Sequence, residues 1–358
     1  MKIVLIDTAV PINSRNKKIL ESLKKHFPHY ELHLISWLRG GAVVIPENTE
    51  KWVSHFYIKA APLGRRIAKL QNIFGFARYV NHIIRKISPD LIIASHWDTL
   101  LCVSERNIKN KILVYENLDM PDIPGLVGRL VRIAERRKVK KAKIMICASR
   151  FFVEQYPDNI NKAILENKSA LFFQNEIYSV NNPLRVSFVG SIRYFPILKN
   201  LIIALKNDPR FSLAFHGSGE ALEALKTFSI GCKNVSFTGN YQYEDVLNFY
   251  KQTDVIWAAY PNKSANVKYA ISNKYHESLL TGVPCVYSEN TCLGEYVADN
   301  GLGFTVNPYD VASIKSLFES LHSNKNLLLS AHVSLLEHNK KETSWDDDFV
   351  AIYKAILQ

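Results

Sequence analysis

The stretch ISNKYHESLLTGVPCVYS, residues 271–288, predicts a short capped helix that leads directly into a β-strand. Ser272 is a favourable N-cap residue, and Gly282 stands where the end of a helix requires a residue with positive φ. The proline two residues later cannot continue the helix, so the apolar run CVYS predicts a buried strand. Such a connection from helix to strand is the repeating unit of an α/β fold.

The same alternation of strand and helix extends along the chain in both directions. Apolar runs rich in Ile and Val predict strands in the first half at residues 2–7, 31–36, 90–95, 111–116 and 143–149. In the second half they predict strands at residues 185–191, 211–217, 234–239, 254–260, 285–288 and 303–306. The regular pattern weakens through residues 167–183, and Asn-Asn-Pro at its end predicts a linker near residues 175–184. We therefore expect two doubly wound, Rossmann-like α/β domains, residues 1–178 and 184–340, that face each other across a ligand-binding cleft.

Length and composition agree with two cytoplasmic domains. The chain has 358 residues, of which 47% are hydrophobic, and this suffices for two ordinary cores. The run MKIVLIDTAV is too short for a signal peptide, and no apolar stretch approaches the roughly 18 residues that span a bilayer. The five cysteines show no C-x-x-C spacing, which favours reduced thiols and no zinc site.

Basic residues are concentrated in the first half. Residues 1–180 contain 29 Lys and Arg against 16 Asp and Glu, whereas residues 181–358 contain 16 against 17. This asymmetry favours an anionic partner for the N-terminal domain, either nucleic acid or an acidic membrane surface. A merely solvated basic face would have the same composition.

Two segments combine basic residues with a helical apolar period. Residues 129–143 carry eight basic residues, and one helix face can hold Leu130, Ile133, Ala134 and Val139. Residues 64–86 have a second apolar stripe, formed by Ile67, Leu70, Phe74, Ala77 and Ile84. It is flanked by Arg65, Arg66, Lys69, Arg78, Arg85 and Lys86. Such helices bind anionic lipid head groups, and no signature of a nucleic-acid module is present. The sequence therefore predicts a peripheral protein on the inner face of the cytoplasmic membrane, without a nucleic-acid partner.

Lys274 and Glu277 lie on the first turns of the predicted helix 273–281. A helix N-terminus and a lysine together suit a diphosphate, and a carboxylate suits the two hydroxyls of a ribose. The two residues therefore indicate a nucleotide. An exposed i,i+3 ion pair is the alternative explanation.

The segment NKYHESLLTGVPCVYSENTCLGEYVADNGLGFTVNPYDVASI resembles the donor-binding region of GT-B glycosyltransferases, especially the broad family 4, or group 1, type. It has a Glu five residues before Gly-x-Pro, then Glu-x-Val and a Gly-x-Gly-like element. The stretches VSFVGSI, HGSGE and NVSFTGNYQYEDVLNFYKQTDVIWAAYP resemble the family's preceding strands in order. The ending SWDDDFVAIYKAIL is similar to its closing helix, so residues 341–358 are expected to return to the N-terminal domain. The resemblance covers residues 184–358 well, and the first half only in pattern.

The resemblance implies a donor site in the second domain. Glu277 would bind the ribose, and Arg193 and Lys199 the diphosphate. The implied donor-binding set is Gly190, Ser191, Arg193, Lys199, Tyr269, Asn273, Lys274 and Glu277. One departure concerns the two-glutamate motif of the retaining enzymes, whose first Glu is replaced here by Tyr269, eight positions before Glu277. The sequence therefore leans toward an inverting reaction, and Asn-Lys-x-x-Glu is similar to a variant in bacterial surface-polysaccharide transferases.

An inverting reaction needs a general base, which we expect from the N-terminal domain. Two predicted strands end in candidates: SHWDT provides His96 and Asp98, and YENLDMPD provides Glu116, Asp119 and Asp122. Some inverting GT-B enzymes for acidic sugars resemble this chain in having an aspartate after the second strand, so Asp119 is the first choice and His96 the second. A loop-capping or structural role is the alternative for each.

Two further motifs carry little weight. HGSGEAL lacks the third glycine of a dinucleotide fingerprint. SWDDDF contains the Asp-x-Asp of metal-dependent glycosyltransferases, but these acids stand where a helix begins and acids are favourable. No metal and no cofactor are expected.

The sequence predicts a metal-independent glycosyltransferase that moves a sugar from a nucleotide diphosphate, most simply UDP, to a lipid-linked glycan of a capsule, lipopolysaccharide or exopolysaccharide. A UDP-sugar 2-epimerase of the same fold and a non-catalytic subunit that binds nucleotide sugars are the alternatives.

Overall fold

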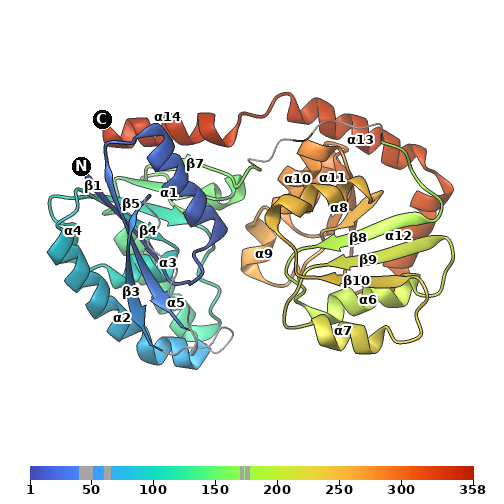
Figure 1. The fold of residues 1–358 in the computed structure, drawn as a ribbon, viewed down its shortest axis with the longest axis horizontal. Helices are drawn as coiled ribbons and strands as arrows, with labels where there is room; N and C mark the ends of the chain where they lie inside the picture. The colour runs from blue at the N-terminus through green and yellow to red at the C-terminus, as the bar shows by residue number, and fades with distance from the viewer. Residues whose placement is uncertain (40–50, 60–65, 170–172, 174–177) are drawn as a thin grey trace. The chain divides into compact units, whose positions relative to one another are not determined.

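The computed structural model describes residues 1–39, 51–59, 66–169, 173 and 178–358, and only the backbone of residues 66–71. The chain forms two compact units (Figure 1). The first contains residues 1–167 and 345–358, and the second residues 168–344. The last helix therefore belongs to the first unit, which confirms the predicted return. From the predicted basic helix, Arg65 and the side chains of Arg66, Ile67, Lys69 and Leu70 lie outside the described part.

The first unit is built on a parallel sheet, with the order β3-β2-β1-β4-β5-β6-β7 within the described residues. The strands are β1 Lys2–Asp7, β2 Glu31–Leu38, β3 Val53–Ile58, β4 Leu91–Ser95, β5 Ile112–Asn117, β6 Ile144–Cys147 and β7 Lys162–Ile164. The helices are α1 Ser14–His26, α2 Arg66–Ile87, α3 Trp97–Cys102, α4 Glu105–Ile108, α5 Gly125–Val139, the 3-10 helix η1 Arg150–Gln155 and α14 Trp345–Leu357. All five predicted strands of this half are present.

The sequence missed the two strands at the edges of this sheet, β3 and β7. The side chains of β3 are exposed at both ends of the strand and only half-buried between them, and β7 has only three residues. Edge strands are covered on fewer sides, so they lack the continuous Ile and Val runs that mark the central strands.

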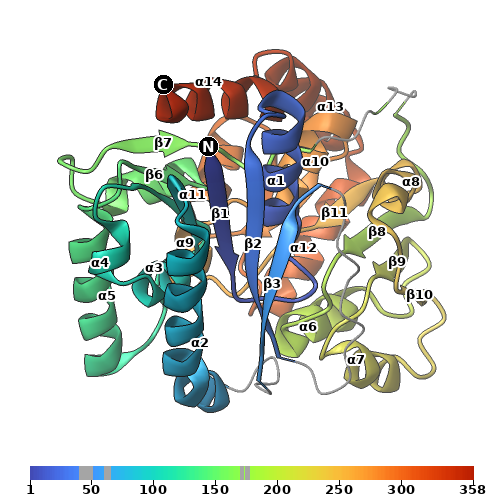
Figure 2. The same ribbon diagram turned by 60° about the vertical axis from the view of Figure 1, so that its left-hand side comes forward.

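Helices cover both faces of the first sheet. Helices α2, α3 and α5 lie side by side on one face (Figure 2). The opposite face carries α1 and α14, which bury Ile19, Leu23, Phe349 and Tyr353 against Leu5 and Leu34 of the sheet. The three aspartates at the start of α14 lie in its first turn, as the helix dipole favours, and Asp346 pairs with Lys25 and His26 of α1. The Asp-x-Asp sequence therefore lies at the N-terminus of a helix, as the sequence predicts.

The second unit is built on a parallel sheet with the order β10-β9-β8-β11-β12-β13 among its described residues. The strands are β8 Leu184–Val189, β9 Phe211–His216, β10 Val235–Gly239, β11 Val255–Trp257, β12 Cys285–Ser288 and β13 Gly303–Val306. The helices are α6 Phe195–Leu205, α7 Leu222–Phe228, η2 Tyr243–Asp245, α8 Val246–Lys251, α9 Ala265–Tyr269, α10 Asn273–Thr281, α11 Cys292–Asp299, α12 Val311–Ser323 and α13 Asn326–Asn339. The six strands predicted in this half are all found. The two units have the α/β class and the Rossmann-like parallel sheets that the sequence predicts.

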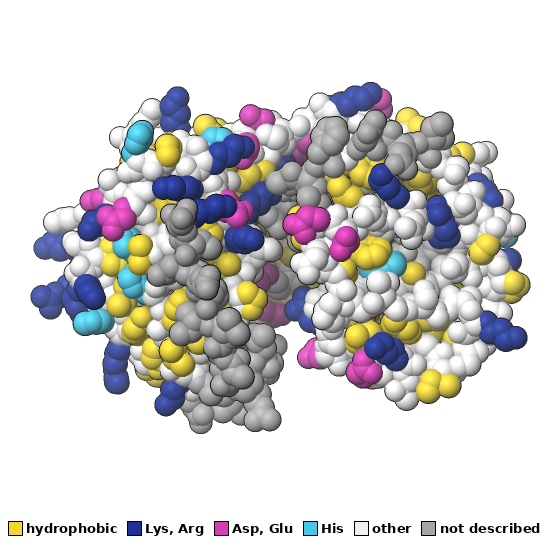
Figure 3. All heavy atoms as spheres, viewed as in Figure 1, with side chains coloured by type: hydrophobic (Ala, Val, Ile, Leu, Met, Phe, Trp, Pro, Cys, Tyr) yellow, Lys and Arg dark blue, Asp and Glu magenta, His cyan; other side chains and the backbone are white. Residues whose placement is uncertain are grey.

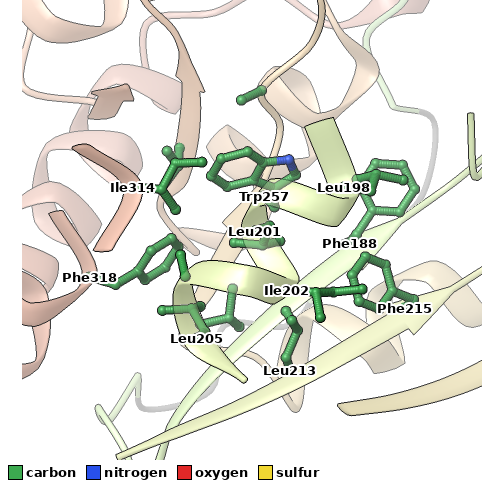
Figure 4. Close-up of a cluster of buried hydrophobic side chains, with 14 of the residues drawn as sticks. Phe188, Leu198, Leu201, Ile202, Leu205, Leu213, Phe215, Trp257, Ile314 and Phe318 are labelled. Atoms are coloured by element: carbon green, nitrogen blue, oxygen red, sulfur yellow. The ribbon is translucent and has the colours of Figure 1, made fainter. Parts of the chain in front are cut away.

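One core of this unit lies between the sheet, α6 and α12. Figure 4 shows Leu198, Leu201, Ile202 and Leu205 of α6 packed among aromatic side chains of the sheet and α12. Their spacing of three and four residues places them on one helix face. Trp257 at the end of β11 packs on Phe318 of α12, with ring centroids 6.3 Å apart. This core fixes the strand ends that surround the candidate site.

The helix predicted from residues 271–288 has the predicted bounds. Helix α10 runs from Asn273 to Thr281, and the Ser272 hydroxyl accepts a hydrogen bond from the Lys274 amide. Gly282 has φ +71°, and a Cβ at this position would lie 2.5 Å from Nδ1 of His332. Backbone conformation and close packing therefore both require glycine there.

The charge count predicts that the first unit has more basic side chains on its surface than the second. Lys and Arg side chains are numerous on the face of the first unit in Figure 3. Within the described ranges, no helix combines the length and the apolar character needed to cross a bilayer.

Candidate functional site

Lys274 lies buried at the first turn of α10, at the carboxyl edge of the second sheet. Its side chain is 6% exposed, and its ammonium donates a hydrogen bond of 2.9 Å to the Tyr260 hydroxyl, just beyond β11. Burial opposes the charge, but Tyr260 and Glu277 outweigh it, so the pKa of Lys274 is raised above its ordinary value. A fixed positive charge therefore stands beside the amide groups at the start of α10.

Glu277 lies one turn further along α10 and is also buried. Its side chain is 7% exposed, and Oε2 accepts a hydrogen bond of 2.7 Å from the Tyr250 hydroxyl of α8. Burial and the charge of Glu277 raise the pKa of Tyr250 well above its ordinary value, so the phenol keeps its proton and remains a donor. Lys274 and Glu277 are therefore held by two different tyrosines, and an exposed ion pair does not describe them.

A cavity of about 280 Å³ opens beside the N-terminus of α10. Its lining includes Arg193, Tyr194, Tyr260, Ser272, Asn273 and Thr291. Among the described residues that line it, Arg193 is the only charged one. One guanidinium, amide groups of a helix N-terminus and several hydroxyls suit a phosphorylated sugar rather than an apolar ligand.

Glycines let the backbone approach closely next to this cavity. A Cβ on Gly190, directly after β8, would lie 3.2 Å from the Lys274 ammonium. A Cβ on Gly217, after β9, would lie 1.9 Å from the Gly190 carbonyl oxygen, and one on Gly219 would lie 2.3 Å from that of Ile192. The glycines of HGSGE therefore serve the packing of two neighbouring strand ends, which explains the motif without a dinucleotide.

In the first unit, His96 follows β4 directly and has a carboxylate near each ring nitrogen. Nδ1 lies 3.0 Å from Oδ1 of the buried Asp98, and Nε2 lies 3.7 Å from Oδ2 of Asp119, whose side chain is half exposed. Burial disfavours the imidazolium, but the two aspartates outweigh it and raise the pKa of His96 to about 9. At neutral pH His96 is therefore protonated and donates toward both carboxylates.

The backbone at His96 is unusual for a residue other than glycine, with φ +83°. Its amide donates a hydrogen bond of 2.9 Å to the Glu116 carbonyl oxygen at the end of β5. The carboxylate of Asp98 also accepts from the Thr99 amide at 2.8 Å. Strained backbone persists where the surroundings hold it, and it is concentrated at functional sites. The ends of β4 and β5 thus hold His96, Asp98 and Asp119 together, as the parallel arrangement predicts.

Glu116 points away from this group of residues. Its side chain is fully buried, Oε2 accepts from Arg15 of α1 at 2.9 Å, and Oε1 accepts from Tyr353 of α14 at 3.1 Å. Side chains alternate along a strand, so Glu116 shares the α1 and α14 face with Val114, opposite Tyr115 and Asn117. The geometry gives Glu116 a structural position in place of the predicted catalytic one.

Comparison with known proteins agrees with this geometry. Residues 183–324 match the family model described as Glycosyl transferases group 1. The succinoglycan biosynthesis protein ExoL of Rhizobium meliloti is 22% identical over 277 residues, which are 69% of this chain and 67% of that protein. Residues 183–324 of this chain are therefore similar to the group 1 glycosyltransferases.

Solved structures show that this chain has the GT-B fold. The sucrose-phosphate synthase of Thermosynechococcus elongatus matches with a TM-score of 0.77 at 13% identity, over 99% of this chain and 98% of that one. The Anabaena protein HepE in complex with UDP and glucose matches with a TM-score of 0.73 at 14% identity, over the whole of both chains. The lipopolysaccharide outer core galactosyltransferase WaaB, in its apo form, matches with a TM-score of 0.65 at 12% identity, over 99% of this chain and all of that one.

The structure brings several residues of the predicted donor-binding set close together. Arg193 and Asn273 line the cavity, Lys274 contacts the lining residue Tyr260, and Gly190 lies next to Lys274. Glu277 lies one turn further along α10, outside the cavity lining, and is bound by Tyr250. Ser191 is exposed in the same loop. Two members lie elsewhere: the Lys199 ammonium faces the Phe195 and Phe228 rings, and Tyr269 ends α9 outside the cavity lining.

Sequence reasoning missed the residues that orient this set. Tyr250 and Tyr260 hold Glu277 and Lys274 from elements 27 and 14 residues away. The one sequence signal for these two tyrosines is their position, since Tyr250 lies near the end of a helix and Tyr260 just after a strand. It also missed His216, which stacks on Phe249 with a centroid distance of 4.0 Å, and whose pKa burial lowers to about 4.

In the first unit, the sequence also missed a buried carboxylate, Glu135 of α5. Its Oε1 accepts hydrogen bonds from Tyr115 at 3.0 Å and Tyr156 at 2.6 Å, and Asn117 donates to both hydroxyls. Burial raises the pKa of Glu135. This network ties α5 to the end of β5, two residues before Asp119.

Proposed function

We propose that this protein is a group 1 glycosyltransferase that transfers a sugar from a UDP-linked donor to a lipid-linked glycan in the synthesis of a surface polysaccharide. The observation that carries the proposal is the pair Lys274 and Glu277, both buried and each held by its own tyrosine. A cation for the diphosphate and a carboxylate for the ribose are thereby fixed before any nucleotide binds. Such preorganisation lowers the entropic cost of binding.

The choice of UDP and of a polysaccharide product has support from similar proteins. HepE was solved with UDP and glucose, and ExoL is named for succinoglycan biosynthesis. In this chain, the aromatic side chains of Tyr241 and Phe249 lie in edge contact, with centroids 5.2 Å apart, and the charges of Lys274 and Glu277 act on Tyr241. They provide a surface for a nucleobase next to the ribose.

We further propose an inverting reaction with Asp119 as general base and without a metal or cofactor. The acceptor oxygen attacks the anomeric carbon of the sugar, its proton passes to the Asp119 carboxylate, and the bond to the diphosphate breaks with its electron pair on the leaving oxygen. The protonated His96, held by Asp98, orients the carboxylate. Lys274, Arg193 and the α10 amides stabilise the charge that develops on the diphosphate.

Donor chemistry is tested with UDP-, GDP-, CDP- and ADP-sugars. Thermal-shift measurements identify the nucleotide, and incubation with a membrane extract as acceptor source reports the reaction. Release of UDP with transfer of the sugar is expected. An altered sugar on intact UDP would instead identify an epimerase, and binding without either change a non-catalytic subunit. Asp119→Asn should retain UDP affinity and lose transfer at least 100-fold.

We also propose that the protein docks on the inner face of the cytoplasmic membrane through α5. Four apolar side chains of this helix are exposed: Leu126 by 72%, Val127 by 57%, Leu130 by 58% and Ile133 by 40%. Exposed arginines flank them at positions 129, 132, 136 and 137. The predicted apolar face thus points outward, except for Val139, which is buried. An apolar stripe between arginines suits the boundary between acyl chains and anionic head groups.

Vesicle flotation tests this surface. The full chain should float with vesicles of phosphatidylglycerol and phosphatidylcholine, and the double variant Leu126→Glu/Leu130→Glu should stay at the bottom of the gradient. Ile230→Glu is the matched control, because Ile230 is an apolar residue of the second unit with 81% exposure. Flotation of the double variant at the control's level would refute docking through α5.

A further inference from the structure

Arg39 directly follows strand β2 and has no part in the proposed reaction. Its Nε and Nη2 atoms are buried, and neither has a hydrogen-bond partner within the described part of the chain. The guanidinium lies over the Trp37 ring, 4.8 Å from its centroid. Because buried polar atoms are nearly always hydrogen-bonded in proteins, two orphaned donors on one guanidinium point to a missing partner.

The two carboxylates near Arg39 already accept other hydrogen bonds. Asp7 accepts from the amides of Ala9 at 3.1 Å and Asn13 at 3.0 Å. Asp98 accepts from Thr99 and lies against His96. Burial lowers the pKa of Arg39, whereas the charges of Asp98 and Asp7 oppose this effect. The carboxylates therefore help to keep the guanidinium charged, but they leave its Nε and Nη2 donors unoccupied.

The orphaned donors have a defined chemical preference. Nε and Nη2 form one edge of the planar guanidinium, and two parallel N–H groups on such an edge match a carboxylate or two oxygens of a phosphate.

Arg39 and the proposed general base, Asp119, both follow strands of the first sheet, at its carboxyl edge. Strands β1 and β4 lie between β2 and β5, so the strand ends that lead to Arg39 and to Asp119 are three strand spacings apart, about 14 Å. One acceptor molecule can span this distance, with its hydroxyl at Asp119 and a charged group at Arg39.

We propose that Arg39 binds an oxyanion of the acceptor through its Nε and Nη2 edge. The inference rests on the proposed function, because it assigns the acceptor to this edge of the first sheet. The oxyanion has two sources in a lipid-linked glycan: the carboxylate of an acidic sugar, or the diphosphate that joins the glycan to its lipid. Both present the same pair of oxygens.

Titration calorimetry with two probes that lack a nucleotide tests the proposal on the full chain. Geranyl diphosphate represents the lipid diphosphate, and methyl glucuronide represents the acidic sugar. We expect at least one to bind the wild type, at least tenfold more weakly to Arg39→Gln, and with intermediate affinity to Arg39→Lys, which keeps the charge but loses the two-pronged geometry. The matched control is Arg106→Gln, which removes an exposed charge from the same unit and should bind like the wild type.

The outcomes separate this proposal from the proposed function. Binding of geranyl diphosphate alone assigns the lipid diphosphate, and binding of the glucuronide alone assigns an acidic sugar. The proposal is overturned if neither probe binds the wild type, or if Arg39→Gln and Arg106→Gln bind equally. UDP titrated into the same samples should bind all variants alike. A wild type that fails to bind UDP would count against the donor assignment, whereas the probe results would still decide the role of Arg39.

Discussion

Tyr353 of the last helix donates a hydrogen bond of 3.1 Å to Oε1 of Glu116, 237 positions earlier in the chain. Arg15 donates to the other carboxylate oxygen at 2.9 Å, and all three side chains are buried. The carboxylate thus joins α1, β5 and α14 inside the first unit. The same strand, β5, leads two residues later to Asp119, so the closing helix is part of the framework that holds the proposed base.

Replacing Tyr353 with Phe should destabilise the protein. The substitution leaves Oε1 of Glu116 buried without its donor, which costs about 1–3 kcal/mol of unfolding free energy. Urea denaturation followed by circular dichroism measures the change. Tyr309→Phe, at a residue with 38% exposure, is the control and should change stability little. Equal midpoints for the two variants would contradict the structural role of the bond.

Lys274→Met should weaken binding of UDP but not of uridine. Both ligands contain the base and the ribose, and only UDP carries the diphosphate that the ammonium is proposed to contact. Loss of a hydrogen bond to a charged group costs about 1.5–3 kcal/mol, or roughly 10- to 150-fold in affinity. Calorimetric titration of both ligands checks this. An equal loss for uridine and UDP would rule out a contact specific to the diphosphate.

Glu277→Ala should weaken binding of uridine and UDP alike, because both carry the ribose hydroxyls. The expected loss is about 1–3 kcal/mol. Tyr250→Phe is the companion variant, since Tyr250 donates to Glu277 but is not proposed to contact the nucleotide. Tyr250→Phe keeps the carboxylate and should cost less affinity than Glu277→Ala, whereas unchanged affinity of Glu277→Ala for both ligands would rule out the contact to ribose.

The stability contributed by His96 should depend on pH. Its pKa is raised from 6.5 to about 9 in the folded protein, chiefly by Asp98 and Asp119 against the effect of burial. The stabilisation is therefore fully present below about pH 6.5 and is lost as the pH rises through about 9. The difference in unfolding free energy between wild type and His96→Asn should shrink between these values. A difference that is constant over this range would show that the imidazolium is not stabilised.

Glu135→Ala should destabilise the first unit by about 1–3 kcal/mol, because two buried tyrosine hydroxyls lose their acceptor. Glu135→Gln keeps a carbonyl oxygen at the same position and should recover much of the loss. Urea midpoints of the two variants measure this ordering. A fully stable Glu135→Ala would mean that the network contributes nothing to holding α5 on β5.

Much of the framework follows from local sequence. The central strands were found because strands buried on both faces need continuous apolar runs. The bounds of α10 followed from Ser272 and Gly282, whose roles depend on neighbouring backbone groups alone. Edge strands β3 and β7 were missed because partial burial leaves no such run.

Some residues of the candidate site could likewise be predicted from the sequence, and others could not. Lys274 and Glu277 could be proposed from their positions on one helix, and His96, Asp98 and Asp119 from parallel strands that end at one edge. The burial of Glu116 could not be predicted from the sequence. A shift of one residue along a strand moves a side chain to the opposite face of the sheet, and the exact end of the strand was not known. Lys199 lies on α6, the helix after β8, as the predicted diphosphate contact requires. Its ammonium nevertheless lies against the rings of Phe195 and Phe228.

By itself, then, the sequence determined the two parallel-sheet units, the capped helix and the residues at its first turns, because periodicity, capping and glycine act over a few residues. Only the tertiary structure decided which side chains orient them. Tyr250, Tyr260 and Tyr353 reach their partners from distant elements, and Arg39 keeps two donors unoccupied between engaged carboxylates. Such contacts depend on side-chain direction and on packing between elements, and neither is encoded in the spacing of residues along the chain.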